Sequence, residues 1–274
     1  MYSNKENVNI LTALLAAYGV RHAVVCPGSR NAPIVHNLNE CPGIECHPVT
    51  DERSAAFCAI GISLATDMSP VAVCVTSGSA LLNVAPAVAE AFYRHIPLIV
   101  ISADRPAQWI GQLDGQTLPQ PGAFGMMVRK DISLPEPHND EERWMCGRMV
   151  CEALYLSTCR TPAPVHINVP ITEPLFTFDS ERLPDVRAIR RCQRDSRDCM
   201  CDTLPDGWFV ARKPMVVIGQ MPCGAIDSRT LKELSSSFVT LCEPLGAEAV
   251  HFDEVVRAIG NDRDYMPDYI IYIG

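Results

Sequence analysis

The stretch His22-Ala-Val-Val-Cys-Pro-Gly-Ser-Arg30 runs from a short apolar segment directly into a turn. The apolar run has the length of a buried strand, and the proline and glycine end it. The same pattern, an apolar run that stops at glycine, proline or charge, recurs at 50–53 (Thr-Asp-Glu-Arg), 76–79 (Thr-Ser-Gly-Ser) and 103–106 (Ala-Asp-Arg-Pro). In an open parallel sheet, the loops that leave the carboxyl ends of the strands share one edge, where ligands bind. We therefore expect these four loops to line one site.

The spacing of the apolar runs predicts the fold class. Strands are expected at 22–26, 44–49, 71–76, 97–103 and 163–169, and segments of helical length separate them. Small residues recur at spacings of three and four between 52 and 66, which is typical of a helix packed closely on a sheet. This alternation predicts right-handed βαβ crossovers, and hence an α/β domain with an open parallel sheet covered by helices on both faces.

Composition divides the chain into three parts. Residues 1–178 are predicted to form the first α/β domain, and residues 179–212, rich in Arg, Asp and Cys, to form a linker. A second α/β pattern occupies 213–274, with strands expected at 215–219, 238–242 and 269–273. Because a parallel sheet needs helices over both faces, this second domain is expected to be partial and the chain truncated.

Charge and hydropathy exclude several classes of protein. The net charge of −9 argues against a nucleic-acid or anionic-membrane surface, although a local basic pocket remains open. The most apolar stretch, 80–101, is interrupted by polar residues, so no membrane span is predicted. The N-terminus lacks the features of a signal peptide. We expect a cytoplasmic protein.

The 13 cysteines do not form a metal or disulfide pattern, because their number is odd and no C-x-x-C occurs. Most are expected to be free, buried thiols that pack as small apolar groups. Cys199-Met-Cys201 is the only pair worth testing for metal, and it has no histidine nearby.

Glu52 follows the second predicted strand, at the first turn of a helix. It could interact there with free backbone N–H groups, although Asp51 is the better cap. Alternatively, its carboxyl group points into the crevice, where burial would raise its pKa. The residues alone leave both interpretations open.

Two arginines follow the first and fourth predicted strands. Arg30 and Arg105 each present a rigid fork of donors that suits a carboxylate or phosphate, which indicates an anionic small ligand; two surface ion pairs are the alternative. Ser29 and Gly28 offer further donors beside Arg30.

Two more loops carry candidate ligand contacts. Ser77-Gly78-Ser79 opens a helix whose free N–H groups could hold an anion or a polar ring. Gln116 and Gln120 lie in a loop rich in turn formers; glutamines there are usually solvent-facing, but Gln116 is a candidate substrate contact. Strict Walker A and G-x-G-x-x-G motifs are absent. His22, His47, His95 and His166 lie in or beside strands, where structural roles are expected.

Six motifs in order resemble one enzyme family. They are Cys26-Pro-Gly-Ser-Arg-Asn-Ala-Pro33, Thr50-Asp-Glu-Arg53, Thr76-Ser-Gly-Ser79, Ser102-Ala-Asp-Arg-Pro106, Gln120-Pro-Gly-Ala-Phe124 and His166-Ile-Asn-Val-Pro-Ile-Thr-Glu-Pro-Leu175. Together they cover residues 20–175 and resemble the thiamine-diphosphate-dependent 2-succinyl-5-enolpyruvyl-6-hydroxy-3-cyclohexene-1-carboxylate synthases (MenD) of menaquinone biosynthesis. Residues 213–274 resemble the start of that family's middle domain.

The resemblance implies roles for the candidate residues. Glu52 would contact N1′ of the cofactor's aminopyrimidine and favour the imino tautomer that deprotonates C2 of the thiazolium. Gly28, Ser77 and Gly78 would lie on the cofactor side of the site. Isochorismate would be oriented by a second set of residues, Ser29, Arg30, Arg105 and Gln116. The parent enzyme would decarboxylate 2-oxoglutarate and transfer its succinyl-semialdehyde unit to isochorismate.

The family's G-D-G and asparagine segment, which holds Mg²⁺ and the cofactor diphosphate, has no counterpart in these 274 residues. By the resemblance, the parent would be a homodimer or homotetramer with active sites between subunits, and this chain alone would lack metal and turnover. Two other interpretations remain open: another thiamine-diphosphate 2-oxoacid decarboxylase or carboligase, and a non-catalytic α/β ligand-binding module.

Overall fold

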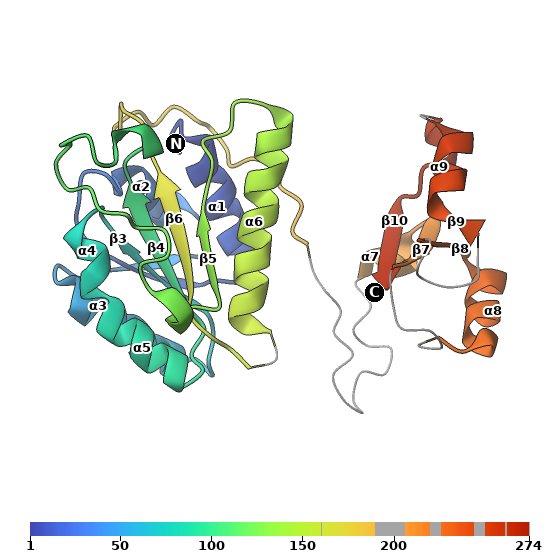
Figure 1. Ribbon diagram of the computed structural model, residues 1–274, viewed down its shortest axis with the longest axis horizontal. Helices are drawn as coiled ribbons and strands as arrows, with labels where there is room; N and C mark the ends of the chain where they lie inside the picture. Colours follow the sequence, from blue (N-terminus) through green and yellow to red (C-terminus); the bar gives the residue numbers. More distant parts are fainter. Residues whose placement is uncertain (160, 190–205, 220–225, 244–249, 261, 274) are drawn as a thin grey trace. The chain divides into compact units, whose positions relative to one another are not determined.

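Six strands of the first part of the chain form a parallel sheet in the order β2-β1-β3-β4-β6-β5, as seen in the computed structural model (Figure 1). The strands are β1 (His22–Val25), β2 (Glu45–Pro48), β3 (Val71–Val75), β4 (Leu98–Asp104), β5 (Lys130–Ser133) and β6 (Val165–Pro170). The structure describes residues 1–159, 161–189, 206–219, 226–243, 250–260 and 262–273. The chain divides into two compact units, Met1–Arg191 and Cys192–Gly274, and each is described by itself. The domain limits expected at 178 and 213 stay predictions.

The strand order contains a switch point. β1 pairs with β2 on one side and with β3 on the other, so His22 lies opposite both Glu45 and Val71. The chain therefore crosses over in one direction after β1 and in the opposite direction after β2. Ligands of open α/β sheets bind at the carboxyl ends of the strands beside such a point. The loops after β1 and β3 lie next to each other there.

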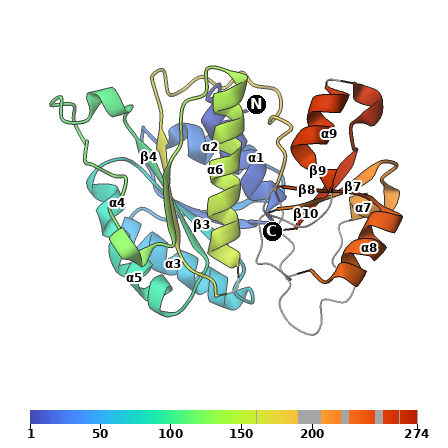
Figure 2. The same ribbon diagram turned by 45° about the vertical axis from the view of Figure 1, so that its right-hand side comes forward.

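Helices cover both faces of this sheet, as the sequence predicts (Figures 1 and 2). One face packs against α1 (Glu6–Ala17), α2 (Ala32–Glu40) and α6 (Asp140–Thr158), and the other against α3 (Glu52–Ala65), α4 (Ser79–Asn83) and α5 (Ala85–Tyr93). Along β1, Val25 joins the first core and Val24 the second. This alternation is the period of a strand buried on both sides.

Helix α3 begins where the carboxylate of Asp51 caps it. Asp51 Oδ1 accepts a hydrogen bond of 2.8 Å from the Ser54 backbone N–H, which lowers the pKa of Asp51. The small side chains of Ala55, Ala56 and Ala59 are fully buried against the sheet. The prediction that Asp51 caps this helix is confirmed, and the helix places Glu52 in its first turn.

The second unit has its own parallel sheet, in the order β10-β7-β8-β9. Its elements are α7 (Asp206–Val210), β7 (Pro214–Ile218), α8 (Ser228–Ser237), β8 (Val239–Cys242), β9 (Val250–His251), α9 (Phe252–Ile259), the short turn η3 (Arg263–Tyr265) and β10 (Tyr269–Ile273). The predicted second α/β pattern is confirmed. Strand β9 and helix α9 were not predicted, and β9 spans only two residues.

Most cysteines of the described residues are buried, as expected, and the buried thiols of Cys26, Cys41, Cys74, Cys146 and Cys151 form no disulfide. Cys199 and Cys201, the pair singled out for metal, lie outside the described residues. Among the helices that the structure describes, none combines the length and the apolar character needed to cross a membrane.

Candidate functional site at the carboxyl ends of the strands

Hydrogen bonds of Gln120 join the loops that follow β3 and β4. Its Oε1 accepts a hydrogen bond of 2.7 Å from the backbone N–H of Gly78, and its Nε2 donates to the Ala103 carbonyl at 3.1 Å. Gln120 is 1% exposed, so the expectation that both loop glutamines face solvent is wrong for this residue. A buried amide can satisfy several backbone groups at once, and here it fixes one loop against another.

The loop after β1 lies against the loop after β3. A Cβ on Gly28 would lie 2.5 Å from both Asn31 Oδ1 and Thr76 Cβ, which leaves room only for glycine. Gly78 has a φ of +82°, and a Cβ there would lie 3.0 Å from the Gln116 carbonyl oxygen. Both glycines permit a close backbone approach, so the three loops that carry Gly28, Gly78 and Gln116 converge.

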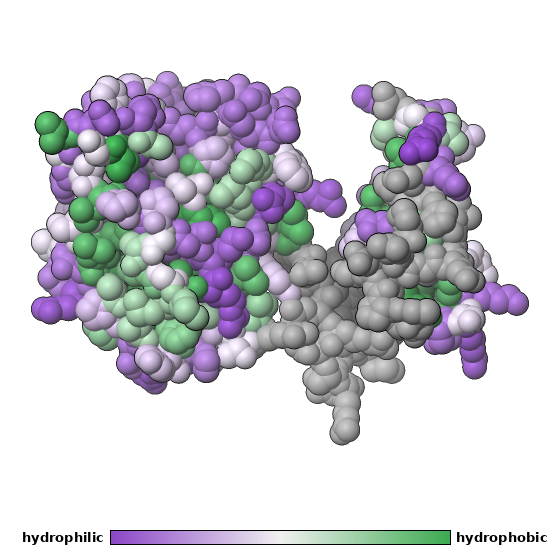
Figure 3. Space-filling view, viewed as in Figure 1, coloured by the Kyte–Doolittle hydropathy of each residue, from purple (hydrophilic) through white to green (hydrophobic). Residues whose placement is uncertain are grey.

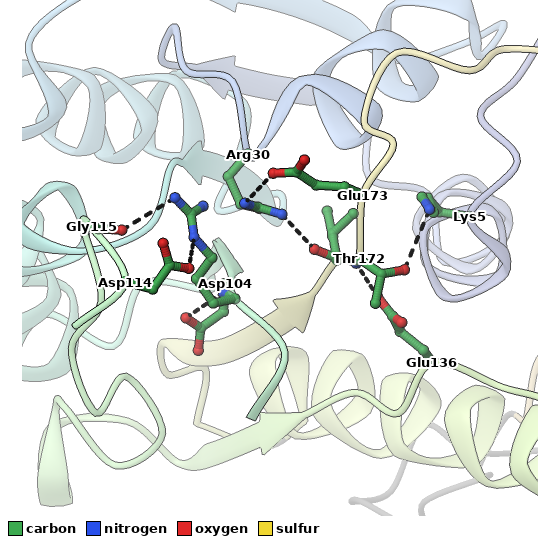
Figure 4. A network of polar contacts seen from close by, with 10 residues as sticks. Lys5, Arg30, Asp104, Asp114, Gly115, Glu136, Thr172 and Glu173 are labelled. Carbon is green, nitrogen blue, oxygen red and sulfur yellow. Dashed lines mark hydrogen bonds and ion pairs between the residues drawn. The ribbon is translucent and has the colours of Figure 1, made fainter. Parts of the chain in front are cut away.

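Arg30 is buried, with 6% of its surface exposed. Its Nη1 donates to the Ile171 carbonyl at 2.8 Å and its Nη2 to Glu173 Oε1 at 3.1 Å, so the segment after β6 holds the guanidinium (Figure 4). Burial lowers the pKa of Arg30, and the neighbouring Arg105 charge lowers it further. The two guanidiniums are therefore close enough to repel each other.

Arg105 occupies the position directly after β4. Its Nε donates to Asp114 Oδ2 at 2.7 Å and its Nη2 to the Gly115 carbonyl at 3.2 Å (Figure 4). These two partners belong to the loop that also carries Gln116. The alternative of two surface ion pairs holds in part, because each arginine has a carboxylate partner. Arg30 is buried, however, and both arginines lie at the same edge of the sheet.

Glu52 lies half-buried at the start of α3. Its Oε2 accepts a hydrogen bond of 3.3 Å from Asn83 Nδ2, at the end of α4. Burial raises the pKa of Cys26 to about 12, and the Glu52 and Asp51 carboxylates add to the rise. Glu52 thus lies near the carboxyl end of β1 and is not in open solvent.

A buried polar network supports this edge of the sheet from β4 and β6. Both ring nitrogens of His166 are hydrogen-bonded. Its Nε2 lies 2.8 Å from Ser102 Oγ, and its Nδ1 lies 2.7 Å from Asp131 Oδ2. Asn168 Nδ2 donates to Asp104 Oδ2 at 2.9 Å. Burial raises the pKa of Asp104. The structural role expected for His166 is confirmed. The network around it was not predicted, because it depends on β6 pairing with β4 on one side and β5 on the other, which no local pattern reveals.

Three buried side-chain atoms of this region have no hydrogen-bond partner among the described residues: Arg30 Nε, Asn31 Oδ1 and Ser77 Oγ. Buried polar atoms are nearly always paired, so each is a place where a bound molecule or water would be stabilised. Ser29 and Gln116 lie exposed beside them, and Gln116 Nε2 donates to the Ser77 carbonyl at 3.3 Å. One N–H donor, one amide oxygen that accepts and one hydroxyl that can donate or accept, with guanidiniums and a carboxylate nearby, suit a polar heterocycle and an anionic ligand.

Residues 6–125, which contain β1 to β4 and the loops that follow them, match the family model "Thiamine pyrophosphate enzyme, N-terminal TPP binding domain". Over all of its length the chain is also 48% identical to the 2-succinyl-5-enolpyruvyl-6-hydroxy-3-cyclohexene-1-carboxylate synthase of Phocaeicola vulgatus and 47% identical to that of Bacteroides thetaiotaomicron. It is 37% identical to the synthase of Porphyromonas gingivalis. The chain belongs to this synthase family. It spans 51% of the length of the first two relatives and 49% of the third.

Proposed function

We propose that the protein containing this chain is a thiamine-diphosphate-dependent synthase that decarboxylates 2-oxoglutarate and adds the succinyl-semialdehyde unit to isochorismate. The first unit of the chain would supply the aminopyrimidine side of the active site and the contacts to the acceptor. The observation that carries this proposal is the placement of Arg30 and Arg105 at the carboxyl edge of a sheet whose family uses thiamine pyrophosphate.

The residues at the switch point fit the cofactor's pyrimidine ring. When bound, thiamine diphosphate supplies the carbon nucleophile for decarboxylation and carbon–carbon bond formation. Glu52 would hold a proton shared with N1′ of that ring. Ser77 Oγ, buried without a partner among the described residues, would take up a hydrogen bond, and Gly28 and Gly78 allow close approach of the backbone.

The arginines are proposed to orient the acceptor through its carboxylates. Two cations held near each other repel, and an anion placed between them would remove that repulsion. Arg30 Nε, buried and without a partner in the described part of the chain, is available for such a contact. Exposed Ser29 and Gln116 would add hydrogen bonds from the loops on either side.

Other partners of the site are proposed outside this chain. Mg²⁺ and the cofactor diphosphate would be held by the part of the relatives' length that the chain does not span. We also propose a homodimer or homotetramer. In support, helices α3 to α5 expose the large apolar side chains of Phe57, Leu64, Leu82, Phe92 and Tyr93. Figure 3 shows hydrophobic surface over these helices. Sedimentation of the intact protein tests this, and a monomer would contradict it.

A comparison of partial reactions in the intact protein tests the proposed acceptor site. Arg105→Lys keeps the charge but loses the fork that contacts Asp114 and Gly115. We expect kcat/KM for isochorismate to fall about 10- to 100-fold, the worth of a charged hydrogen bond. Decarboxylation of 2-oxoglutarate without acceptor should change little. The control Arg148→Lys changes an exposed arginine that pairs with Glu152 and should leave both rates unchanged.

Other outcomes would favour the other interpretations. Equal loss of both partial reactions would mean that Arg105 supports the structure and not the acceptor. Preference for pyruvate-type substrates would favour a different 2-oxoacid carboligase. Absence of any decarboxylation with thiamine diphosphate and Mg²⁺ would favour a ligand-binding module.

A further inference from the structure

Two histidines and a glutamate meet at the opposite ends of the strands from the loops described above. His22 is the first residue of β1, Glu45 is the first residue of β2, and His47 follows two residues later. Among the described residues, these three form a group whose ligand atoms all lie within 4.8 Å of one another. Nothing in the proposed synthase reaction uses them.

The register of the sheet brings the three side chains to one face. His22 lies opposite Glu45, and Val24 lies opposite His47, in the parallel pairing of β1 with β2. Partners in a parallel pair point to the same side, and residues two apart on a strand share a face. Val24 packs in the core under α3 and α5, so the three polar side chains lie on that side of the sheet. Cys46, between Glu45 and His47, points to the other face, where it contacts the first core.

The donor atoms are arranged around one nitrogen. His22 Nδ1 lies 3.2 Å from His47 Nε2 and 3.6 Å from Glu45 Oε2. In a tetrahedral zinc site, bond lengths of about 2.0–2.1 Å place neighbouring donors about 3.3–3.4 Å apart. The two measured separations lie on either side of that value.

The exposure of the side chains also suits an ion. The His22 side chain is 24% exposed, so it is partly fixed by its surroundings, while the Glu45 side chain is 69% exposed and free to adjust. β2 is the edge strand of the sheet, so solvent can supply the remaining ligands. Without a metal, the 3.2 Å between His22 Nδ1 and His47 Nε2 allows one hydrogen bond, in which one ring donates and the other accepts.

We propose that His22 Nδ1, His47 Nε2 and Glu45 Oε2 bind one divalent ion of the zinc class, with water completing the coordination. Two imidazoles and a carboxylate are the ligand set that Zn²⁺, Co²⁺ and Ni²⁺ accept, whereas Mg²⁺ prefers oxygen ligands alone. The ion takes the place of the proton between the two rings. It joins the edge strand β2 to β1 and so stabilises the folded unit.

Titration of the chain without an affinity tag tests the proposal, with ZnCl₂ followed by calorimetry and CoCl₂ followed by absorption. We expect one site that binds Co²⁺ with visible d–d bands. His47→Gln should weaken binding at least tenfold, roughly the effect of losing even an outer-shell partner of a metal ligand. Glu45→Gln should weaken it as well. The control His138→Gln changes an exposed histidine in a distant loop and should leave the affinity unchanged.

Two further readouts separate this site from the cysteines and from misfolding. Thiolate ligands would give Co²⁺ a strong near-ultraviolet charge-transfer band, and such a band persisting in His47→Gln would overturn the proposal. Zn²⁺ should raise Tm of the unaltered chain in a concentration-dependent way that a chelator reverses, and should not raise it in His47→Gln. Equal binding in all variants, or no binding by the folded unaltered chain, would also overturn the proposal.

Discussion

The charged guanidinium of Arg30 is buried, where the loss of hydration makes a charge costly. A guanidinium that is 6% exposed must replace its hydration with fixed partners, and Arg30 does so with the Ile171 carbonyl and Glu173 Oε1. Its third nitrogen, Nε, remains without a partner in the described residues. Burial and the Arg105 charge lower its pKa, so the fold carries an unfavourable interaction at this point. Such strain is typical of sites that a ligand completes.

The role of the Glu52 carboxyl group can be tested without changing the size of the side chain. In the intact protein, Glu52→Gln keeps the size of the side chain and can keep the contact to Asn83. It removes the group that would hold the proton at N1′. We expect exchange of the cofactor C2 proton to slow by about 10²- to 10⁴-fold, the usual contribution of a positioned acid–base group. Cofactor affinity should change much less.

Proton exchange followed by NMR measures this effect, and Glu233→Gln, at an exposed glutamate of α8 that pairs with Arg229, is the control. Near-normal exchange in Glu52→Gln would rule out the role given to Glu52. Parallel losses in affinity and exchange would point to a disturbed fold.

At the scale of elements, the strands of the first sheet were predicted well where they are buried on both faces. β1, β3 and β4 lie within one or two residues of their predicted ranges, because their apolar runs end abruptly at turn formers. Strand β5 was missed, since the edge strand Lys130–Ser133 has one buried residue and no apolar run. Its existence depends on pairing with β6, which no local pattern reveals.

The site was predictable only as far as topology determines it. Parallel strands bring Arg30 and Arg105 to one edge whatever their partners are. The partners themselves, Glu173 and Asp114, come from loops whose paths depend on tertiary packing. For the same reason the sequence did not indicate that Gln120 is the buried glutamine and Gln116 the exposed one.

The loop between β3 and α4 yields a prediction of its own. Gly78→Ala places a Cβ at a φ of +82° and a ψ of −139°, 3.0 Å from a backbone oxygen. We expect a loss of about 1–3 kcal/mol in the free energy of unfolding, the usual cost of such a backbone conformation. Gly61→Ala, inside α3, meets no atom within 4 Å and should add about 0.5–1 kcal/mol.

Urea unfolding of both variants measures these changes. A stable Gly78→Ala protein would mean that the loop can move away from Gln116, and the convergence of the loops would then not be fixed by that glycine.

At the scale of the whole molecule, the thiols report on the integrity of the core. Burial raises the pKa of Cys26, Cys74 and Cys146 to about 12 each, which keeps them protonated and shielded, whereas Cys58 is exposed. In the folded protein at pH 8, we expect iodoacetamide to label Cys58 and to leave the three buried thiols unmodified. Mass spectrometry of native and urea-treated samples measures this. Native labelling of Cys74 would contradict the described core.

The contact between Arg30 and the segment after β6 links the two ends of the first unit, across 141 residues to Ile171 and 143 to Glu173. Synthesis runs from the N-terminus, so the arginine leaves the ribosome long before the groups that hold it. Most strands of the first unit can therefore be synthesised while the Arg30 guanidinium still lacks these two partners. The proposed anion recognition at this edge would become available only once the segment after β6 has docked, which would make it a late event in the maturation of the unit.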